Sequence, residues 1–417
     1  GRLMPERTIL HCDMNNCYAS IELISNPQWR GKPLAVCGSA EERRGIVLAK
    51  SEEAKKFGIK TGETLWQAKL KCPDLITVEP HYEEYLKYSR LARSIYYQYT
   101  DRVEPFGLDE CWLDCTGSIS LLGSGEKIAE EIRERIKNEL GITVSIGVSF
   151  NKIFAKLGSD LKKPDAVSFI GRTDFRRKLW KLSASELLGV GRSTAEKLRR
   201  YGINTIGDLA GADPRLMMQI LGKNGIQIWN HANGRDESDV MPAGYRAPVK
   251  SIGHGITCIM DLVNDEEVKL VFLELCQDVS RRLRDNQLKA SGVMISVRDS
   301  TMACRQYQCI LKIPSQCSSE ITRAASELFS RKYSWDAPVR ALAISAINLM
   351  DEETPYQQDL FSNHEKHEKL ERAERAMHSL RKRYGKKSVT YASLIQDIKI
   401  PGERTDIVVL PTMAGRY

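Results

Sequence analysis

The chain has 417 residues, of which 42% are hydrophobic and 28% charged, and its net charge is +8. The length predicts more than one domain, and the composition is that of an ordinary globular protein. No apolar run is long enough to cross a membrane and no secretory segment is found, so we expect a cytoplasmic protein without membrane contact. The eleven cysteines include no CxxC pair, which favours reduced structural thiols over disulfides or zinc. The positive charge suits a polyanionic partner but does not identify one.

The first predicted element is a short buried strand over 8–12, which runs directly into Asp13 and is followed by a helical segment over 19–22. Further along, apolar residues spaced by four predict a helix over 128–140. Apolar residues at every second position then predict a strand over 142–148. With a hairpin between these segments, the order strand, helix, hairpin, helix, strand is that of a ferredoxin-like fold.

The hairpin occupies 105–114, where a Pro-Phe-Gly turn precedes a strand of alternating apolar residues. Two adjacent acids, Asp109 and Glu110, lie at its mouth, where they repel each other and stabilise nothing by packing. A solvated acidic turn is the ordinary explanation of such a pair. Because Asp13 ends another strand, a second explanation is a two-metal site, in which carboxylate oxygens bind Mg²⁺ ions about 3.5–4 Å apart.

The segments HCDMNNCYASIE (11–22) and PFGLDECWLD (105–114) together resemble the catalytic motifs of Y-family (translesion) DNA polymerases. The closest match is the bacterial branch that contains polymerase IV and the UmuC-like proteins. The resemblance extends from about Thr8 to Met350, with a further short match in the tail. It is more specific than either acidic motif alone, because several independent motifs follow in the order of the family.

The resemblance implies an α+β fold of the right-hand polymerase type. Its parts are a ferredoxin-like palm, small fingers, a helix-hairpin-helix thumb and a separate α/β little-finger domain. The implied boundaries are palm 4–25 and 80–170, fingers 26–79, thumb 171–235, linker 236–249, little finger 250–350, and tail 351–417.

The resemblance also assigns the catalytic residues. It implies that Asp13, Asp109 and Glu110 hold two Mg²⁺ ions, with the main-chain carbonyl of Met14 as a further ligand. With these ions bound, the primer 3′-hydroxyl would attack the α-phosphate of a dNTP and release pyrophosphate.

Five further residues match family positions around the nucleotide. Tyr18 is implied to be the steric gate that selects deoxynucleotides, and Lys55 and Lys163 to contact the triphosphate of the dNTP. Gly38 and Ile46 are implied to cover the templating base. Two positions near Lys55 depart from the polymerase IV pattern and are not carried over.

In the thumb, Gly189 and Gly191 precede a basic helical segment that begins near Arg192, which looks like a helix-hairpin-helix. Glycines in such a turn expose backbone N–H groups at a helix N-terminus, where a DNA phosphate binds favourably.

The little finger is expected to be a sheet with two helices. The predicted helices are 268–283 and 318–332, and the predicted strands are 292–297, 307–313 and 339–349, with a further strand starting near 250. Its sheet face is expected to carry Arg298, Arg305 and Lys312 toward the backbone of the duplex, which would give affinity without base specificity.

The tail contains a peptide, Tyr356–Phe361, that resembles the docking peptide of bacterial polymerases for the β sliding clamp. Leu360 and Phe361 would be the apolar anchors, with Gln357 and Asp359 beside them. A highly charged helix is predicted over 365–383 without an assigned role, and the residues up to 417 have no assigned function.

The expected function is therefore template-directed DNA synthesis past lesions, in DNA repair and the SOS response, by a monomer. Its partners would be primer–template DNA, dNTP and the β sliding clamp. Two alternatives stay open. One is a palm-type nucleotide cyclase, because Gly107–Glu110 faintly resembles the GGDEF hairpin of those enzymes. The other is a catalytically inactive DNA- and clamp-binding regulator.

Overall fold

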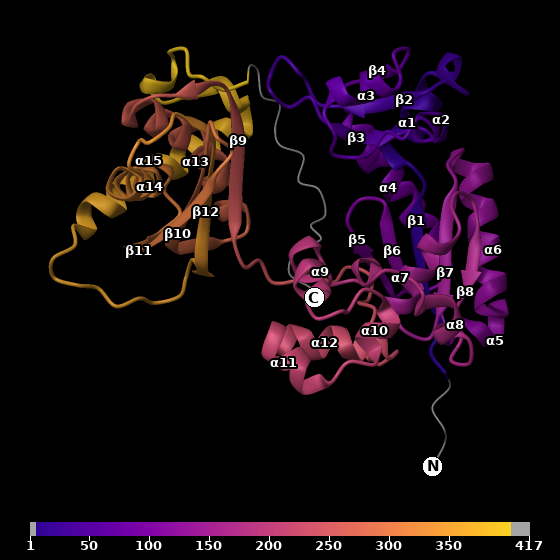
Figure 1. Ribbon diagram of the computed structural model, residues 1–417. Coiled ribbons are helices and arrows are strands. Elements are labelled where there is room, and N and C mark those ends of the chain that lie inside the picture. The colour runs from indigo at the N-terminus through magenta and orange to yellow at the C-terminus, as the bar shows by residue number, and fades with distance from the viewer. Residues whose placement is uncertain (1–5, 402–417) are drawn as a thin grey trace. The chain divides into compact units, whose positions relative to one another are not determined.

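A computed structural model describes residues 6–401, which form two compact units (Figure 1). The first unit comprises residues 6–38 and 46–246, and the second comprises residues 39–45 and 247–401. No helix within the described residues is both long and apolar enough to span a membrane.

The first unit is built on a five-stranded sheet with the order β5-β6-β1-β7-β8. The strands are β1 (Ile9–Met14), β5 (Val103–Phe106), β6 (Glu110–Asp114), β7 (Val144–Ser149) and β8 (Val167–Phe169). β1 pairs antiparallel with β6 and β7, β5 pairs antiparallel with β6, and β8 is parallel to β7. The predicted ferredoxin-like order is confirmed, with β8 added at one edge.

Helices cover both faces of this sheet (Figure 1). They are α1 (Cys17–Ser25), α4 (Tyr82–Tyr96), α5 (Ile119–Leu122), α6 (Gly125–Arg135), which continues as a π-helical turn (Ile136–Leu140), and α7 (Lys152–Leu161). Alternate residues of a strand face opposite ways. Leu10 and Cys12 of β1 therefore enter the core beneath α1, α4 and α6, whereas His11 and Asp13 lie on the face that α7 covers.

The insertion between α1 and α4 forms a small subdomain, but residues 39–45 of the predicted fingers 26–79 belong to the second unit. It holds β2 (Leu34–Cys37), β3 (Val47–Lys50), β4 (Ile76–Val78), α2 (Glu52–Lys56) and α3 (Leu65–Lys71), with the strand order β3-β2-β4. α3 starts with a capping box, in which Thr64 and Gln67 each accept the backbone N–H of the other.

The thumb consists of short helices around one apolar core. They are α8 (Phe175–Leu179), α9 (Arg192–Arg199), α10 (Ile206–Ala210), α11 (Pro214–Leu221) and α12 (Lys223–Ala232). The expected helix-hairpin-helix is reduced on its first side to a single 3₁₀ turn, Ala184–Glu186. The turn does not continue as a helix, because Leu187 is already extended (φ −73°, ψ 132°) and Gly189 has a positive φ of 95°.

The predicted linker 236–249 is too long, because its first part belongs to the first unit. Val240 is completely buried in a cluster with Phe106 and Trp112. The amide of Ala243 donates a 2.7 Å hydrogen bond to the carbonyl of Asp101. The two units divide after residue 246. The polar composition of the segment predicted a linker and gave no sign that Val240 packs into the palm.

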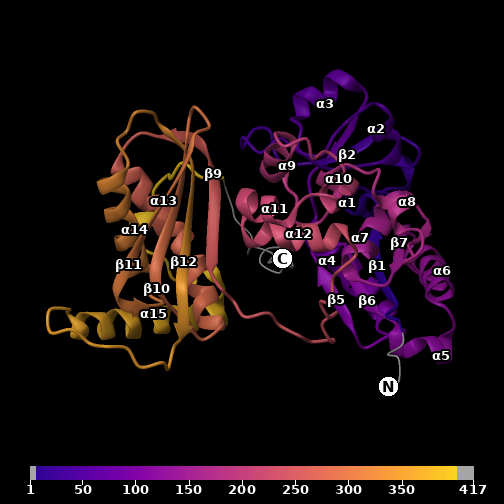
Figure 2. The ribbon, with the colours of Figure 1, turned by 60° about the horizontal axis from the view of Figure 1, so that its bottom comes forward.

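The second unit is a four-stranded antiparallel sheet with the order β11-β10-β12-β9. Its strands are β9 (Ile252–Leu262), β10 (Leu288–Asp299), β11 (Cys304–Ser315) and β12 (Val339–Asp351). α13 (Asp265–Asp285) and α14 (Ser318–Lys332) pack side by side on one face (Figure 2). This confirms the predicted α/β module.

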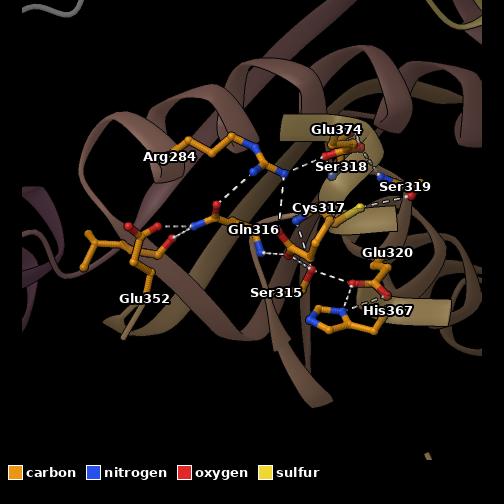
Figure 3. Close-up of polar contacts among 12 residues, drawn as sticks. Arg284, Ser315, Gln316, Cys317, Ser318, Ser319, Glu320, Glu352, His367 and Glu374 are labelled. Carbon is orange, nitrogen blue, oxygen red and sulfur yellow. Dashed lines mark hydrogen bonds and ion pairs between the residues drawn. The ribbon is translucent and has the colours of Figure 1, made fainter. Parts of the chain in front are cut away.

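The segment after β12 is not a free tail. It includes α15 (His364–Tyr384) and two 3₁₀ turns, Lys386–Ser388 and Ala392–Leu394. Glu374 of α15 accepts hydrogen bonds from the amides of Ser318 (2.7 Å) and Ser319 (3.2 Å) at the start of α14, and its carboxylate lies 3.3 Å from Arg284 of α13. Figure 3 shows how these groups converge at the N-terminus of α14.

A second contact joins the start of α15 to the start of α14. His367 lies 2.8 Å from the Glu320 carboxylate of α14, and Ser315 donates a 2.6 Å hydrogen bond to that carboxylate (Figure 3). Farther along the chain, the amide of Ile259 in the edge strand β9 donates a 3.1 Å hydrogen bond to the carbonyl of Lys399. The described part of the segment from 364 onward is therefore part of the little-finger domain.

Candidate active site

Three acids lie where β1 and β6 end at the same edge of the palm sheet. Asp13 is the direct cross-strand partner of Glu110, so both side chains lie on one face. The Met14 amide donates a 3.0 Å hydrogen bond to the Asp109 carbonyl, which holds the hairpin against the end of β1. The structure thus brings together the residues that the sequence assigned to one metal site.

Two ammonium groups from α7 and the turn after it bind these acids. Lys163 Nζ lies 2.6 Å from Asp13 Oδ2 and 2.9 Å from Asp160 Oδ1. Lys156 pairs with Glu110. Each ammonium therefore occupies a carboxylate that family resemblance assigns to a metal.

A glycine allows α7 to lie close enough to the sheet for these contacts. A Cβ built on Gly147 of β7 would lie 1.9 Å from the carbonyl oxygen of Ala155. Any larger residue at this position would push the helix away from the sheet, and the two lysines with it.

The acids are held in an environment that disfavours their charge. Burial, together with a smaller effect of the Asp13 charge, raises the pKa of Asp109 to about 6. Burial raises the pKa of Glu110 to about 7, although Lys156 opposes the rise. Burial also raises the pKa of Asp13 against the opposing effect of Lys163. Burial alone would lower the pKa of Lys163, but Asp13 and Asp160 raise it.

Sequence reasoning missed His11, which lies beneath the acids. His11 is completely buried; its Nδ1 lies 2.8 Å from Ser159 Oγ and its Nε2 3.4 Å from Glu110 Oε1. Burial lowers its pKa, and so do Lys156 and Lys163. Its position two residues before Asp13 places it on the same face of β1, and that spacing was the only available signal.

Asn15 was also given no role. Its side chain accepts hydrogen bonds from Thr143 Oγ1 (2.9 Å) and the Asp165 amide (3.0 Å), and donates one to Ser145 Oγ (3.0 Å). These contacts join the end of β1 to β7 and to the turn that carries Lys163. Asn15 therefore supports the geometry of the site from outside the acid cluster.

Tyr18 projects from the first turn of α1 and is half-buried. Its ring stacks on Tyr85 at 4.2 Å between centroids and meets Tyr82 edge to face at 5.9 Å. Burial raises the pKa of Tyr18 to about 12, with smaller contributions from Tyr82 and Asp109. Its role as a steric gate stays a prediction.

The residues expected in the fingers lie in two groups. Gly38 and Ile46 are joined by a 3.2 Å hydrogen bond from the Gly38 amide to the Ile46 carbonyl, and the Ile46 side chain is exposed. Lys55 lies 3.6 Å from Glu52, whose carboxylate accepts a 2.7 Å hydrogen bond from Asn16 at the start of α1. Glu52 thus anchors α2 to α1.

The expected DNA contacts of the thumb are available on its surface. Gly189 has a positive φ of 95°, and Gly191 is the N-cap of α9. The side chain of Arg192, the first residue of that helix, is exposed. No ligand contact tests their role, so it stays a prediction.

The expectation that three basic residues share one face of the little-finger sheet is wrong for Arg305. Arg305 pairs with Val297, whose side chain is buried under the helices, and it lies 3.6 Å from Asp299. Arg298 and Lys312 are exposed on the opposite, uncovered face. The strand period alone would have separated them, because 305 and 312 differ by an odd number.

The peptide expected to bind a clamp is fully accessible. Leu360 and Phe361 are 99% and 97% exposed. Asp359 accepts hydrogen bonds from the Phe361 amide (2.7 Å) and from Ser362 Oγ (2.8 Å), which shapes a turn around the two apolar residues. Gln357 is exposed as well.

The acid cluster fits divalent cations on the chemistry of its own groups. It gathers carboxylate oxygens, the ligands that Mg²⁺ prefers, where lysine ammonium groups offset their mutual repulsion. Asp13, Asp109 and Glu110 would hold the ions, and the Met14 carbonyl lies in the same strand end.

Comparisons with known proteins agree with this geometry. Two models of the impB/mucB/samB family match the chain, one over residues 12–160 and the model of its C-terminal domain over residues 249–360. DNA polymerase IV of Acetivibrio thermocellus is 48% identical over 94% of this chain and 98% of its own length. DNA polymerase IV 1 of Bacillus subtilis is 38% identical over 92% of each chain.

A solved structure titled Y-family DNA polymerase chimera Dbh-Dpo4(243-245)-Dbh has a TM-score of 0.72 with this chain. It is 22% identical and covers 82% of this chain and 99% of that one, so it supports the fold.

The palm, its converging acids and the little-finger module define a nucleotidyl-transferring polymerase. The chain belongs to the impB/mucB/samB family of Y-family DNA polymerases, and its relatives place it with bacterial DNA polymerase IV. It is a DNA-directed DNA polymerase of the translesion class, and it binds DNA as its substrate. This identification leaves no support for the cyclase and inactive-regulator alternatives.

Proposed function

We propose that Asp13, Asp109 and Glu110 hold two Mg²⁺ ions, with the Met14 carbonyl as a further ligand. The observation that carries this is the cross-strand pairing of Asp13 with Glu110, beside Asp109 at the hairpin mouth. When bound, the ions supply activation of the primer hydroxyl and charge neutralisation at the phosphates. Membership of the family implies a divalent-metal requirement in any case.

The lysines that occupy the acids are proposed to change partners during the reaction. Lys163 is 31% exposed at its side chain and is therefore free to turn from Asp13 toward a triphosphate, where it forms charge-assisted hydrogen bonds. Lys55, at the surface of α2, is proposed to reach the same phosphates. Lys156, which is less exposed, stays beside Glu110 and balances its charge.

The metal proposal is tested by Mn²⁺ binding in the absence of DNA and nucleotide, together with primer extension. The parent chain should bind Mn²⁺, and Asp109→Ala should bind it much more weakly and extend no primer. The same variant should bind primer–template nearly as the parent does, because the thumb and little finger are untouched. Unchanged Mn²⁺ binding in Asp109→Ala would remove that residue from the site.

Tyr18 is proposed to exclude ribonucleotides. Its ring is fixed by stacking on Tyr85, so it cannot swing aside for a 2′-hydroxyl. Tyr18→Ala should raise ribonucleotide incorporation about a hundredfold relative to deoxynucleotide incorporation. Equal discrimination in variant and parent would reject the gate.

The loop 356–361 is proposed to dock on a β sliding clamp through Leu360 and Phe361. Replacing both by Ala should abolish clamp-stimulated synthesis and leave synthesis without the clamp unchanged. Persistent stimulation would mean that another surface docks. The protein is further proposed to act as a cytoplasmic monomer in the SOS response.

A further inference from the structure

One tryptophan of the fingers lies in an unusual environment. Trp66, in the first turn of α3, is 71% exposed. The other five tryptophans of the chain are buried or partly buried. Within residues 6–401 its indole has no recorded hydrogen bond or ring contact. An indole ring in water costs free energy that packing elsewhere would recover, so its exposure calls for an explanation.

Trp66 belongs to a mixed apolar and basic helix face. Residues three and four positions apart lie on one side of a helix, which places Lys69 and Leu70 beside Trp66. Lys69 is exposed, and Leu70 is 64% exposed. An exposed aromatic ring next to a cation is the combination that binds single-stranded nucleic acid, because bases stack on the ring and phosphates approach the ammonium.

This face is continuous with the residues proposed to cover the templating base. Ile46 forms an antiparallel bridge with Thr64, the N-cap of α3, only two residues before Trp66. The amide of Val47 donates a 2.9 Å hydrogen bond to the carbonyl of Glu63, which fixes the same two segments together. Cys37, at the end of β2 that leads into Gly38, and Ala68 of α3 are buried in one apolar cluster, so α3 packs against that end of the strand.

We propose that the α3 face formed by Trp66, Lys69 and Leu70 binds the unpaired template strand ahead of the active site, with a template base stacked on Trp66. The inference rests on the proposed covering role of Gly38 and Ile46. The template strand that has not yet been copied must extend from the active site past that cover, and the α3 face adjoins the cover through the bridge between Ile46 and Thr64. A stacked base would hold the template straight as each new position enters the site.

The experiment measures the affinity of the parent chain and of Trp66→Ala for two primer–template duplexes. One carries a single-stranded 5′ template overhang of about ten nucleotides, and the other has one unpaired template nucleotide. The parent should bind the long-overhang DNA more tightly, and Trp66→Ala should lose about tenfold on that DNA only. Trp66→Phe, which keeps a smaller ring, should lose less than Trp66→Ala.

A third duplex separates base stacking from phosphate binding, because its overhang consists of abasic nucleotides. Parent and Trp66→Ala should bind this DNA equally, since no base remains to stack. Leu121→Ala is the matched control: Leu121 is 86% exposed, lies in α5 of the palm, and should affect no DNA. Because Trp66 is exposed, its replacement should leave thermal unfolding unchanged.

The proposal is overturned if Trp66→Ala binds the long-overhang DNA as the parent does, or if its loss is equal on the abasic overhang. Failure of the chain to bind even the short-overhang duplex is a separate result, which would count against the proposed primer–template function instead.

Discussion

The two units of the molecule each contain three neighbouring carboxyl groups, and the two sets have different partners. In the palm, Asp13 pairs with the ammonium of Lys163, which is partly exposed, and Glu110 pairs with that of Lys156 and lies 3.4 Å from the imidazole of His11. In the little finger, Glu374 is held by backbone amides at the start of α14 and by Arg284, whose side chain is 7% exposed. Glu320 and Glu371 complete that second set, next to His367.

The difference shows how an acid cluster can be judged from its partners. Backbone amides and a buried guanidinium form a fixed set of donors, and a carboxylate that accepts from them is satisfied where it is. A lysine ammonium on a flexible stem can leave for a phosphate. The palm cluster is therefore suited to exchange its cations, and the little-finger cluster is suited to fasten α15.

The comparison predicts opposite effects of a charge-removing substitution on activity and on stability in the palm. Asp109→Asn should lower primer extension by about three orders of magnitude, since an acidic metal ligand is lost. It should raise the free energy of unfolding at pH 8 without metal, on the order of 1 kcal/mol, because a carboxyl whose pKa is raised to about 6 is held charged at a cost.

The sign follows from proton linkage. Because the pKa of Asp109 is raised in the folded protein, the protein loses stability as pH rises from the unfolded pKa near 4 through the folded pKa of about 6. The stability gained by replacing Asp109 with Asn should therefore be present at pH 8 and small at pH 4. Chemical unfolding in EDTA at both pH values measures it. Asp101→Asn, at an exposed position, is the control, and a stability loss in Asp109→Asn would contradict the prediction.

In the little finger the same kind of change should do the reverse. Glu374→Ala leaves the amides of Ser318 and Ser319 and the charge of Arg284 without their carboxylate, and should destabilise the second unit by about 3 kcal/mol. Basal primer extension per folded molecule should be unchanged, because the acids of the palm are untouched.

Amide hydrogen exchange of α14 and α15 measures this loss within the intact chain. Glu368→Ala, on the exposed side of α15, provides the matched control and should leave exchange unchanged. If Glu374→Ala reduced primer extension but left amide exchange normal, the little-finger carboxylates would have a role in activity, and the division into a catalytic and a structural cluster would be wrong.

The sequence predicted those parts of the molecule that are set by local pattern. The ferredoxin-like order, the α/β little finger and α14 at Ser318–Lys332 followed from apolar periodicity, and the acids at two strand ends followed from motif and position. What it could not give depends on long-range packing. Val240 in the supposed linker looks like any isolated apolar residue until its contacts with Phe106 and Trp112 are seen.

Polar partners far apart in sequence were equally out of reach. The highly charged helix predicted over 365–383 had no assigned role, yet Glu374 caps another helix more than fifty residues earlier in the chain. His11 looked like one polar residue in a strand, and only the packing of α7 brings Ser159 and Glu110 to it. Arg305 was placed on the wrong face although a local rule would have been enough. Side chains of a strand alternate between its two faces, and this rule was not applied to Arg305.

The smallest predicted effect concerns the pH dependence of the anchor at the start of α15. The hydrogen bond that the imidazole of His367 donates to the Glu320 carboxylate raises the pKa of His367 against the effect of burial. Burial alone would raise the pKa of Glu320, but His367 lowers it. Glu371 and Lys289 also face the imidazole, the first raising and the second lowering its pKa.

The contribution of His367 to stability is therefore complete below its unfolded pKa of 6.5 and is lost as pH rises through its raised folded value. The contribution of Glu320 to stability is complete above its unfolded pKa of 4.5 and is lost only as pH falls through its lowered folded pKa. His367→Gln should thus cost more stability at pH 6 than at pH 9, as measured by hydrogen exchange of α15 corrected for intrinsic rates. His364→Gln, one turn earlier, should show no such difference; an equal cost of His367→Gln at both pH values would mean that the pair is held by its geometry and not by its charge.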